Sequence, residues 1–185
     1  SGDCDQSGGD DDYGMVRKMN NFGRQSMYAP IRRMALKHPR QAFISQENLE
    51  AQWQSLVYFG CPDFENSLAE YEKFLGVLEQ FDFEILFAPE DSSTSLDSIY
   101  VHDPLVISER GAILCSMGKA ARAPEPAAAE KYLAEMGVPV LGRIMGDGKL
   151  EGGDVLWVTE RSLAVGQGFR TNAEGLRQLH ILLDD

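Results

Sequence analysis

Two stretches of the chain repeat one another 51 residues apart. HDPLVISER (102–110) and GDVLWVTER (153–161) share an aspartate, a leucine and a Glu-Arg pair at matching places. In both copies an apolar run leads into the Glu-Arg turn and a second one returns, AILCSM (112–117) and LAVG (163–166). Each copy then reads Gly-x-x-x-Arg and continues into apolar residues at helical spacing. A repeat of this length predicts an array of similar units, such as a propeller.

The first copy predicts a strand, a second strand, a helix and a third strand. Its helix has prolines near the start and a stop at Gly137, and VPVLGRI (138–144) supplies the third strand. The second copy reaches its helix through Thr171–Glu174, which has the spacing of a capping box. No third strand follows before the sequence stops. We therefore expect an α/β fold of ββαβ units, the last one incomplete, in a chain that is part of a larger protein.

Before the repeat, the sequence predicts a tail and a first unit. Residues 1–14 contain little that can be buried, which is typical of a disordered acidic tail; residues 15–185 are expected to form the domain. Within it, 29–39 reads as a strand ended by proline, and Asp63 is placed to cap a helix. FEILFA (83–88) reads as another strand. The stretch between the first strand and Asp63 predicts no definite element.

Composition excludes several classes of protein. With 43% hydrophobic residues the chain can bury a core, and its formal net charge of -12 disfavours nonspecific nucleic-acid binding. No apolar run approaches the roughly 20 residues of a membrane span. Three scattered cysteines predict neither a disulfide framework nor a CxxC zinc site. The expectation is a reduced, cytoplasmic protein with no membrane or nucleic-acid partner.

Acids and arginines recur at the ends of the predicted elements. If the strand ends converge on a propeller axis, the acids form a cluster with two arginines on its rim: Asp97, Asp103, Glu151 and Asp154, with Arg122 and Arg170. Close carboxylates repel one another and persist beside a cation. A guanidinium group fits, because its planar donors match carboxylates edge to edge. The glycines after Glu151 would leave room for it to face a ligand.

Two other interpretations of this pattern stay open. Glu-Gly-Gly-Asp (151–154) is most often only a turn. Clustered acids also suit Ca²⁺ or Mg²⁺, although no EF-hand spacing is present. A guanidinium-binding site that needs no metal and no organic cofactor is the preferred prediction.

Three segments carry a resemblance to a known family. SLDSIYVHDPLVI (95–107), LEGGDVLWV (150–158) and VGQGFRTNAEGLRQL (165–179) resemble the first half of the guanidine-modifying (pentein) superfamily. The nearest types are dimethylarginine dimethylaminohydrolases and arginine deiminases, with amidinotransferases more distant. The similarity extends over residues 27–183. It implies a five-bladed α/β propeller of ββαβ units, of which this chain would hold about three, the last incomplete.

The resemblance also implies roles for individual residues. Asp103 would bind the substrate guanidinium, and Glu151 would hold it and pair with a catalytic histidine; these two are the predicted catalytic residues. Asp97 would lie near the substituted nitrogen. Arg122 and Arg170 would hold the amino-acid end of the substrate. In this family a cysteine thiolate attacks the guanidinium carbon, an amine leaves, and water frees the covalent intermediate.

Two departures limit what the resemblance implies. His102 occupies a place where the dimethylarginine enzymes often have an acid, and the family's catalytic histidine and cysteine belong to a second half that this sequence does not contain. Cys115 lies in an apolar run that predicts burial, and we assign no nucleophile.

The predicted function is the substrate-recognition half of a guanidino-group hydrolase, inactive by itself, whose partner is a small guanidino molecule. An amidinotransferase and a non-catalytic pentein binding scaffold are the alternatives. The open edge left by the incomplete unit predicts self-association.

Overall fold

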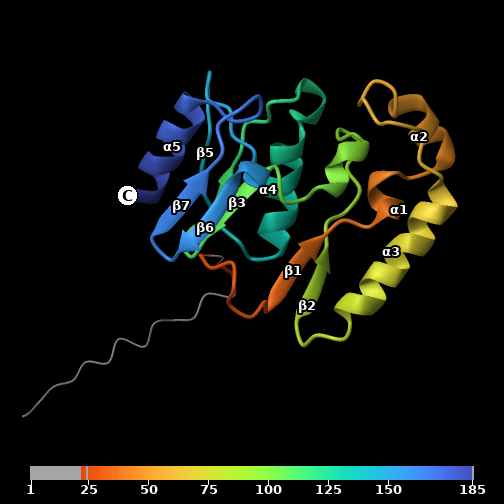
Figure 1. Ribbon diagram of the computed structural model, residues 1–185, viewed down its shortest axis with the longest axis horizontal. Helices are drawn as coiled ribbons and strands as arrows, with labels where there is room; N and C mark the ends of the chain where they lie inside the picture. The colour runs from red at the N-terminus through yellow and green to blue at the C-terminus, as the bar shows by residue number, and fades with distance from the viewer. Residues whose placement is uncertain (1–21, 24, 185) are drawn as a thin grey trace, which may run out of the picture.

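The structure, a computed structural model, describes residues 22–23 and 25–184. The predicted tail, residues 1–14, lies outside them. The described part is a mixed α/β fold with three small sheets, β1-β2, β3-β4-β5 and β6-β7 (Figure 1). The strands are β1 (Arg33–Leu36), β2 (Glu84–Phe87), β3 (Leu105–Ser108), β4 (Gly111–Leu114), β5 (Val140–Arg143), β6 (Val155–Thr159) and β7 (Ser162–Val165).

In the described residues, five α-helices and three short 3₁₀ turns connect these strands. The helices are α1 (Pro39–Ala42), α2 (Gln46–Gln52), α3 (Phe64–Leu78), α4 (Glu125–Glu135) and α5 (Ala173–Asp184). The 3₁₀ turns are η1 (Leu96–Ile99), η2 (Ala120–Arg122) and η3 (Gly152–Asp154). Among the described residues, no helix is long and apolar enough to cross a membrane.

The repeated region folds in the predicted order of elements. β3 and β4 form an antiparallel hairpin, α4 follows, and β5 returns parallel to β4. In the second copy β6 and β7 form the matching hairpin and α5 follows it. Gly137 ends the segment after α4 with a φ of 72°, a left-handed conformation that glycine adopts without strain.

The structure corrects the alignment of the two copies by one residue. Leu105 pairs with Leu114 in the first hairpin, and Val155 pairs with Val165 in the second. Val155, not Leu156, therefore occupies the place of Leu105. A register shift between residues 157 and 159 of β6 absorbs the difference. A bulge of this kind inserts one residue and changes which side chains face the core beyond it.

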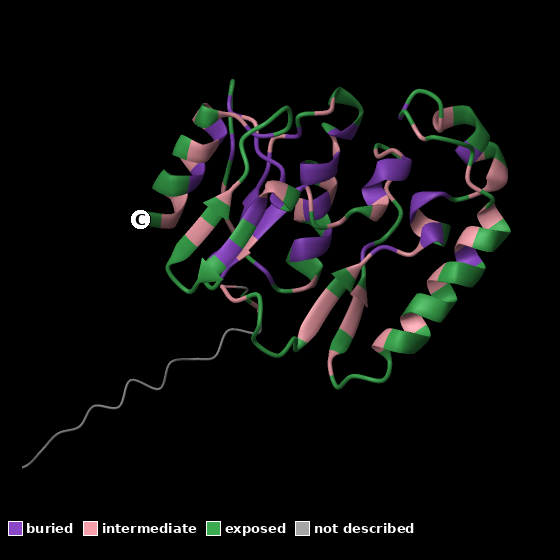
Figure 2. Ribbon diagram, viewed as in Figure 1, coloured by how far each residue is buried: buried purple, intermediate pink, exposed green. Residues whose placement is uncertain are grey.

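The sheet β3-β4-β5 lies at the centre and is covered on both faces. One face packs Leu105, Ala112 and Leu114 against α4. The opposite face packs Val106 and Ile113 against a cluster that includes residues of the second hairpin and α5. Figure 2 shows the buried residues concentrated in these layers and in the segment around α1 and η1.

Before the repeat, the structure confirms some predicted elements and corrects others. Asp63 caps α3 as predicted, its Oδ1 accepting from the backbone N–H of Asn66 at 2.7 Å. The first strand is shorter than predicted, because Pro39 begins α1 instead of merely ending the strand. The stretch that predicted no element contains α1 and α2. α2 is capped by the hydroxyl of Ser45.

Candidate functional site

One loop, residues 116–122, contacts three of the predicted acids. The Gly118 N–H donates to Glu151 Oε1 at 3.0 Å, and Lys119 Nζ donates to Asp97 Oδ2 at 2.6 Å. Four residues past the glycine, Arg122 Nη1 contacts Asp103 Oδ2 at 2.6 Å. The acids come from the turn η1, the entry to β3 and the entry to β6. The segments that carry Asp97, Asp103 and Glu151 thus all contact this one loop.

Two glycines bring the Glu151 segment against the Asp103 segment. The Gly152 N–H donates to the backbone oxygen of Asp103 at 2.7 Å. A Cβ on Gly152 would collide with the carbonyl oxygens of His102 and Leu105, and one on Gly153 would lie 2.7 Å from Asp103 Oδ1. Neither glycine has a positive φ. The sequence therefore needs glycine here for close backbone approach.

Glu151 is buried and holds a guanidinium of the protein itself. Arg170 Nη1 lies 2.9 Å from Glu151 Oε2 and 3.2 Å from Oε1. The Glu151 side chain is 6% exposed, whereas that of Arg170 is 44% exposed. Arg170 therefore lies at the edge of the cluster, with its guanidinium turned inward to the acid.

Arg122 is a correction to the prediction, because it lies in the interior and not on the rim. It is 3% exposed, and its Nε and Nη2 each lie 2.8 Å from a Glu125 oxygen while Nη1 binds Asp103. Its guanidinium also lies 5.7 Å from the centre of the Tyr100 ring. Such a bidentate, enclosed arginine holds acids in place. Glu125 was not among the predicted site residues, although it follows Arg122 by three residues at the start of a helix.

The pKa values of this buried pair follow from its environment. Burial raises the pKa of the Glu125 carboxyl, and the Arg122 charge partly offsets the rise. Burial lowers the pKa of the Arg122 guanidinium, but its hydrogen bonds to Glu125 and Asp103 outweigh this effect and raise it above its usual value. We conclude that Arg122 is permanently charged and that its charge stabilises the ionised carboxylates of Glu125 and Asp103.

Asp97 is held by Lys119, a residue that was not among the predicted site residues. Lys119 Nζ also donates to the Leu56 carbonyl at 2.8 Å, so it joins the turn η1 to the segment after α2. Burial raises the pKa of the nearby Tyr58 hydroxyl, and the Asp97 charge raises it further. Asp97 therefore belongs to the acid cluster, with a protein cation already bound to it.

Asp154 does not join the other acids at a cation, which corrects the predicted cluster. Its Oδ2 accepts from the Thr171 hydroxyl at 2.6 Å, and that hydroxyl oxygen accepts from the Glu151 N–H at 3.2 Å. Thr171 was predicted to cap α5, but Asn172 Oδ1 takes that role by accepting from the Gly175 N–H at 2.8 Å. Asp154 and Thr171 thus fix the backbone of Glu151.

The described cysteines and acids offer neither a ready nucleophile nor a metal site. Cys115 is buried, and burial raises the pKa of its thiol, as do the charges of Glu151 and Asp103. It is therefore protonated at neutral pH, as its apolar context predicted. Cys61 is exposed. Over residues 22–23 and 25–184, no group of three or more His, Cys, Asp or Glu side chains is arranged to hold a metal.

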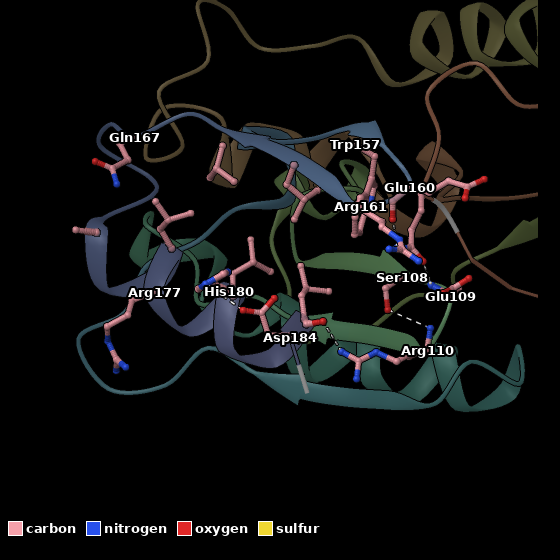
Figure 3. A pocket seen from close by; sticks show the side chains of 17 residues that line it. Ser108, Glu109, Arg110, Trp157, Glu160, Arg161, Gln167, Arg177, His180 and Asp184 are labelled. Atoms are coloured by element: carbon pink, nitrogen blue, oxygen red, sulfur yellow. Dashed lines mark hydrogen bonds and ion pairs between the residues drawn. The ribbon is translucent and has the colours of Figure 1, made fainter.

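A pocket of about 800 Å³ lies elsewhere, between the β6-β7 hairpin and α5 (Figure 3). Trp157 and Leu179 contribute to its apolar lining. At its edge, Arg110 Nη2 donates to the carbonyls of Leu182 and Leu183 near the end of α5. None of the acids around the 116–122 loop lines this pocket. The acid cluster therefore remains the candidate site.

Comparisons with known proteins agree on one family. The family model of arginine deiminase matches residues 90–184, which include the acid cluster. A dimethylarginine dimethylaminohydrolase from Pseudomonas aeruginosa is 30% identical over 127 residues, 69% of this chain and 49% of that protein. One from Streptomyces coelicolor is 37% identical over 83 residues, 45% of this chain and 31% of that protein. The chain thus spans about half the length, or less, of these curated relatives.

Solved structures give the same result. The Pseudomonas aeruginosa dimethylarginine dimethylaminohydrolase complexed with citrulline matches with a TM-score of 0.68 and 25% identity, over 84% of this chain and 58% of that one. The N-terminal domain of a cyanobacterial arginine dihydrolase bound to substrate shares the fold, with a TM-score of 0.64 and 18% identity over 82% and 55% of the two chains. The chain therefore belongs to the arginine deiminase family, within the guanidine-modifying (pentein) superfamily.

Proposed function

We propose that this chain is the substrate-recognition half of a hydrolase that cleaves a C–N bond of an arginine-like guanidino group. The observation that carries the proposal is a buried carboxylate, Glu151, that already holds a guanidinium. Beside it, the side chain of Asp103 has one oxygen on Arg122, and its Oδ1 faces Gly153. A second planar cation could be held between these two acids.

The charges of the cluster suit a cationic guest. Its ion pairs contain four carboxylates, Asp97, Asp103, Glu125 and Glu151, against three cations, Lys119, Arg122 and Arg170. One net negative charge thus remains in a largely enclosed place, where a single guanidinium would neutralise it. Enclosure strengthens such an interaction relative to water.

In the proposed mechanism the acids of this chain keep the guanidinium bound and charged, so that its carbon stays electrophilic. A cysteine thiolate and a histidine would come from polypeptide outside the present chain. The thiolate attacks the carbon, an amine or ammonia leaves with a proton, and water then breaks the C–S bond and restores the thiol. The present chain alone would be inactive, because its buried Cys115 is held as a thiol.

Turnover of a guanidino panel by the full-length protein tests this function. Arginine, its methylated derivatives and agmatine would each be incubated with the protein, and the urea-type product and released amine measured. We expect turnover of at least one compound, with no dependence on added metal, and the same rates in the control variant Glu130→Gln. That control acts on an exposed acid of α4 that pairs with Arg143 and with no cation of the cluster. An absence of turnover for every compound would contradict the proposal.

A second candidate, a non-catalytic binding scaffold, has one observation in its favour. Asp97, Asp103 and Glu151 each have a protein cation in contact, as they would in a site that serves only stability. The guanidino panel separates the two functions, since a scaffold turns over nothing. Amidino transfer to a second amine instead of water would appear in the same assay only when an acceptor amine is present.

We also propose that the modules seen here form part of a propeller. Val106 and Ile113 are buried beneath the second hairpin, whereas Leu156 and Val158 of that hairpin are 45% and 53% exposed. Arg110 in the first hairpin turn binds the end of α5, and Arg161 holds the matching place in the next turn. A further module would cover this face in the same way.

An uncovered apolar face predicts self-association of the chain when it is produced alone. We expect a mass above that of the monomer in light scattering at micromolar concentration, because strand edges and apolar faces associate when uncovered. Replacing Leu156 and Val158 together by glutamate should shift the mass towards the monomer. The matched control places glutamate at the exposed Phe74 of α3, on another element. A wild-type chain that remains strictly monomeric would contradict this prediction.

A further inference from the structure

The segment after α2, residues 53–58, lies against the turn η1 that carries Asp97. Leu56 is buried in the same apolar cluster as Leu96 of that turn. The Leu56 carbonyl accepts from Lys119 Nζ at 2.8 Å, and the same ammonium donates to Asp97 Oδ2 at 2.6 Å. Lys119 thus joins the 53–58 segment to one acid of the cluster.

Tyr58, the last residue of this segment, brings a hydroxyl to the same acid. Burial raises the pKa of that hydroxyl, and the Asp97 charge raises it further, so the two groups are neighbours. The hydroxyl is nevertheless buried without a hydrogen bond to any described residue. The preceding Val57 has a φ of 64°, a strained conformation for a β-branched residue. Backbone strain beside an unsatisfied buried hydroxyl is typical of a place that a ligand completes.

Asp97 itself has one oxygen left for a ligand. Its Oδ2 accepts from Lys119, while no described residue donates to its Oδ1. The hydroxyl of Ser98, from the same turn, is likewise buried without a partner among the described residues. Two oxygens that can accept, Asp97 Oδ1 and Tyr58 Oη, therefore remain at this end of the cluster. A guanidinium nitrogen that carries two hydrogens can donate to both.

A dimethylated nitrogen would fit this place poorly, because it has no hydrogen to donate. Its methyl groups would exclude water from the carboxylate and the hydroxyl without replacing the lost hydrogen bonds. They would also lie near the Lys119 ammonium, whose side chain is only 22% exposed. Burying polar groups without partners costs free energy. A site of this kind rejects an analogue that lacks the hydrogen-bonding group more strongly than an apolar pocket does.

We propose that Tyr58 and Lys119 are specificity-determining residues, which restrict the site to guanidino compounds whose terminal nitrogen carries hydrogens instead of methyl groups. The inference rests on the proposed function. The Tyr58 hydroxyl accepts from the nitrogen that Asp97 binds, and Lys119 holds Asp97 and the 53–58 segment in place. In this respect we expect the chain to differ from the dimethylarginine dimethylaminohydrolases to which it is similar.

The first experiment compares arginine with N,N-dimethylarginine, which has both methyl groups on one terminal nitrogen, as substrates of the full-length protein. We expect kcat/KM to favour arginine by about 100-fold or more. Tyr58→Phe removes the hydroxyl and keeps the ring. It should reduce the preference by about tenfold or more, because arginine loses an acceptor and dimethylarginine loses nothing. Equal use of both substrates by the wild type, or a preference for dimethylarginine, would overturn the inference and leave the proposed function standing.

A second variant and two matched controls make the comparison specific. Lys119→Met replaces the ammonium by an apolar group, so the variant should use dimethylarginine about tenfold better than the wild type does. Lys131→Met, at an exposed lysine of α4, and Tyr71→Phe, on α3, are the controls and should leave the preference unchanged. A Tyr58→Phe variant that keeps the full preference for arginine would overturn the inference.

The second experiment measures thermal unfolding of the present chain without ligand, and it does not depend on turnover. Since the Tyr58 hydroxyl has no partner among the described residues, Tyr58→Phe should leave the unfolding midpoint unchanged or raise it by about 1 to 2 °C. A hydroxyl that served only the fold would lower the midpoint when removed. A fall of more than about 3 °C would therefore contradict the role assigned to Tyr58.

Calorimetry on the full-length protein separates failure of this inference from failure of the proposed function. Arginine should bind about tenfold or more tightly than N,N-dimethylarginine does, and Tyr58→Phe should narrow the difference. Equal affinities would overturn the inference alone. Binding of neither ligand, together with no turnover of the guanidino panel, would overturn the proposed function and this inference with it.

Discussion

Replacing Arg122 by methionine is expected to destabilise the fold by about 3 to 5 kcal/mol. The change removes the cation that pairs with two acids, Glu125 with its 3% exposed side chain and Asp103 at the site. A buried carboxylate without its partner costs far more than the pair contributes when intact. Methionine fills a similar volume, so the loss reports the charges and not a cavity. The measurement is urea unfolding followed by circular dichroism.

Two further variants test whether the loss of stability comes from the unpaired buried charges. Arg143→Met opens an ion pair whose side chains are 48% and 39% exposed, and its effect should stay within about 0.5 kcal/mol. Arg122→Met combined with Glu125→Gln should recover part of the loss, since one of the stranded charges is then absent. A loss below about 1 kcal/mol for Arg122→Met would contradict the structural role assigned to this arginine.

The stability of the Arg122→Met variant should depend on pH with a definite sign. Burial already raises the pKa of Glu125 in the wild type, and without Arg122 nothing opposes that rise. As pH falls, the folded state then takes up a proton before the unfolded state does, so the variant gains stability on acidification. Stability should accordingly be lost again as pH rises through the raised pKa of the folded state.

How far the sequence could predict this structure depends on which interactions are periodic. The repeat predicted the two hairpins and the strand entries at Asp103 and Asp154, because equal spacing along the chain gives equal elements. It could not reveal the bulge in β6, since matching identities placed Leu156 on Leu105 and concealed the extra residue. A bulge is decided by packing on both faces of a hairpin.

The site was predicted better in its acids than in its cations. The start of a strand fixes the backbone position of an acid there, and the short side chain keeps the carboxylate near it. A long cationic side chain can instead turn towards whichever acid is nearest. Arg122 turned inward because Glu125, the first residue of α4, lies three residues later. This contact does not follow from any periodic pattern in the sequence. Lys119 was overlooked for the same reason. α1 and α2, at 4 and 7 residues, are too short to show helical periodicity.

Glu151→Gln is expected to lower turnover of a guanidino substrate by about 10²- to 10³-fold in the full-length protein. The amide keeps the shape of the acid and can still accept from the Gly118 N–H. It loses the negative charge that holds a guanidinium, and its NH₂ group would face the donors of the guest. Affinity for arginine should fall by about 10- to 100-fold, the range for hydrogen bonds to a charged group.

The fold should survive this substitution, which is what makes the measurement decisive. Glu151 has its backbone fixed by Thr171, a contact that the amide does not change. Neutralising it also removes one charge from a cluster in which acids outnumber cations. We therefore expect the unfolding free energy to change by about 1 kcal/mol or less. Glu130→Gln, on the exposed side of α4, is the matched control and should change neither turnover nor stability.

The two readouts together separate the candidate functions. A hydrolase loses turnover while its stability holds, because the charge of Glu151 acts on the guanidinium and not on the core. A binding scaffold retains its partner and shows at most a small change in unfolding, since only the contact with Arg170, itself 44% exposed, is weakened. Full turnover in the Glu151→Gln variant would show that the charge of Glu151 is not needed for the reaction. The guanidinium would then have to be held by Asp103, the remaining acid of the pair, whose Oδ2 Arg122 already occupies.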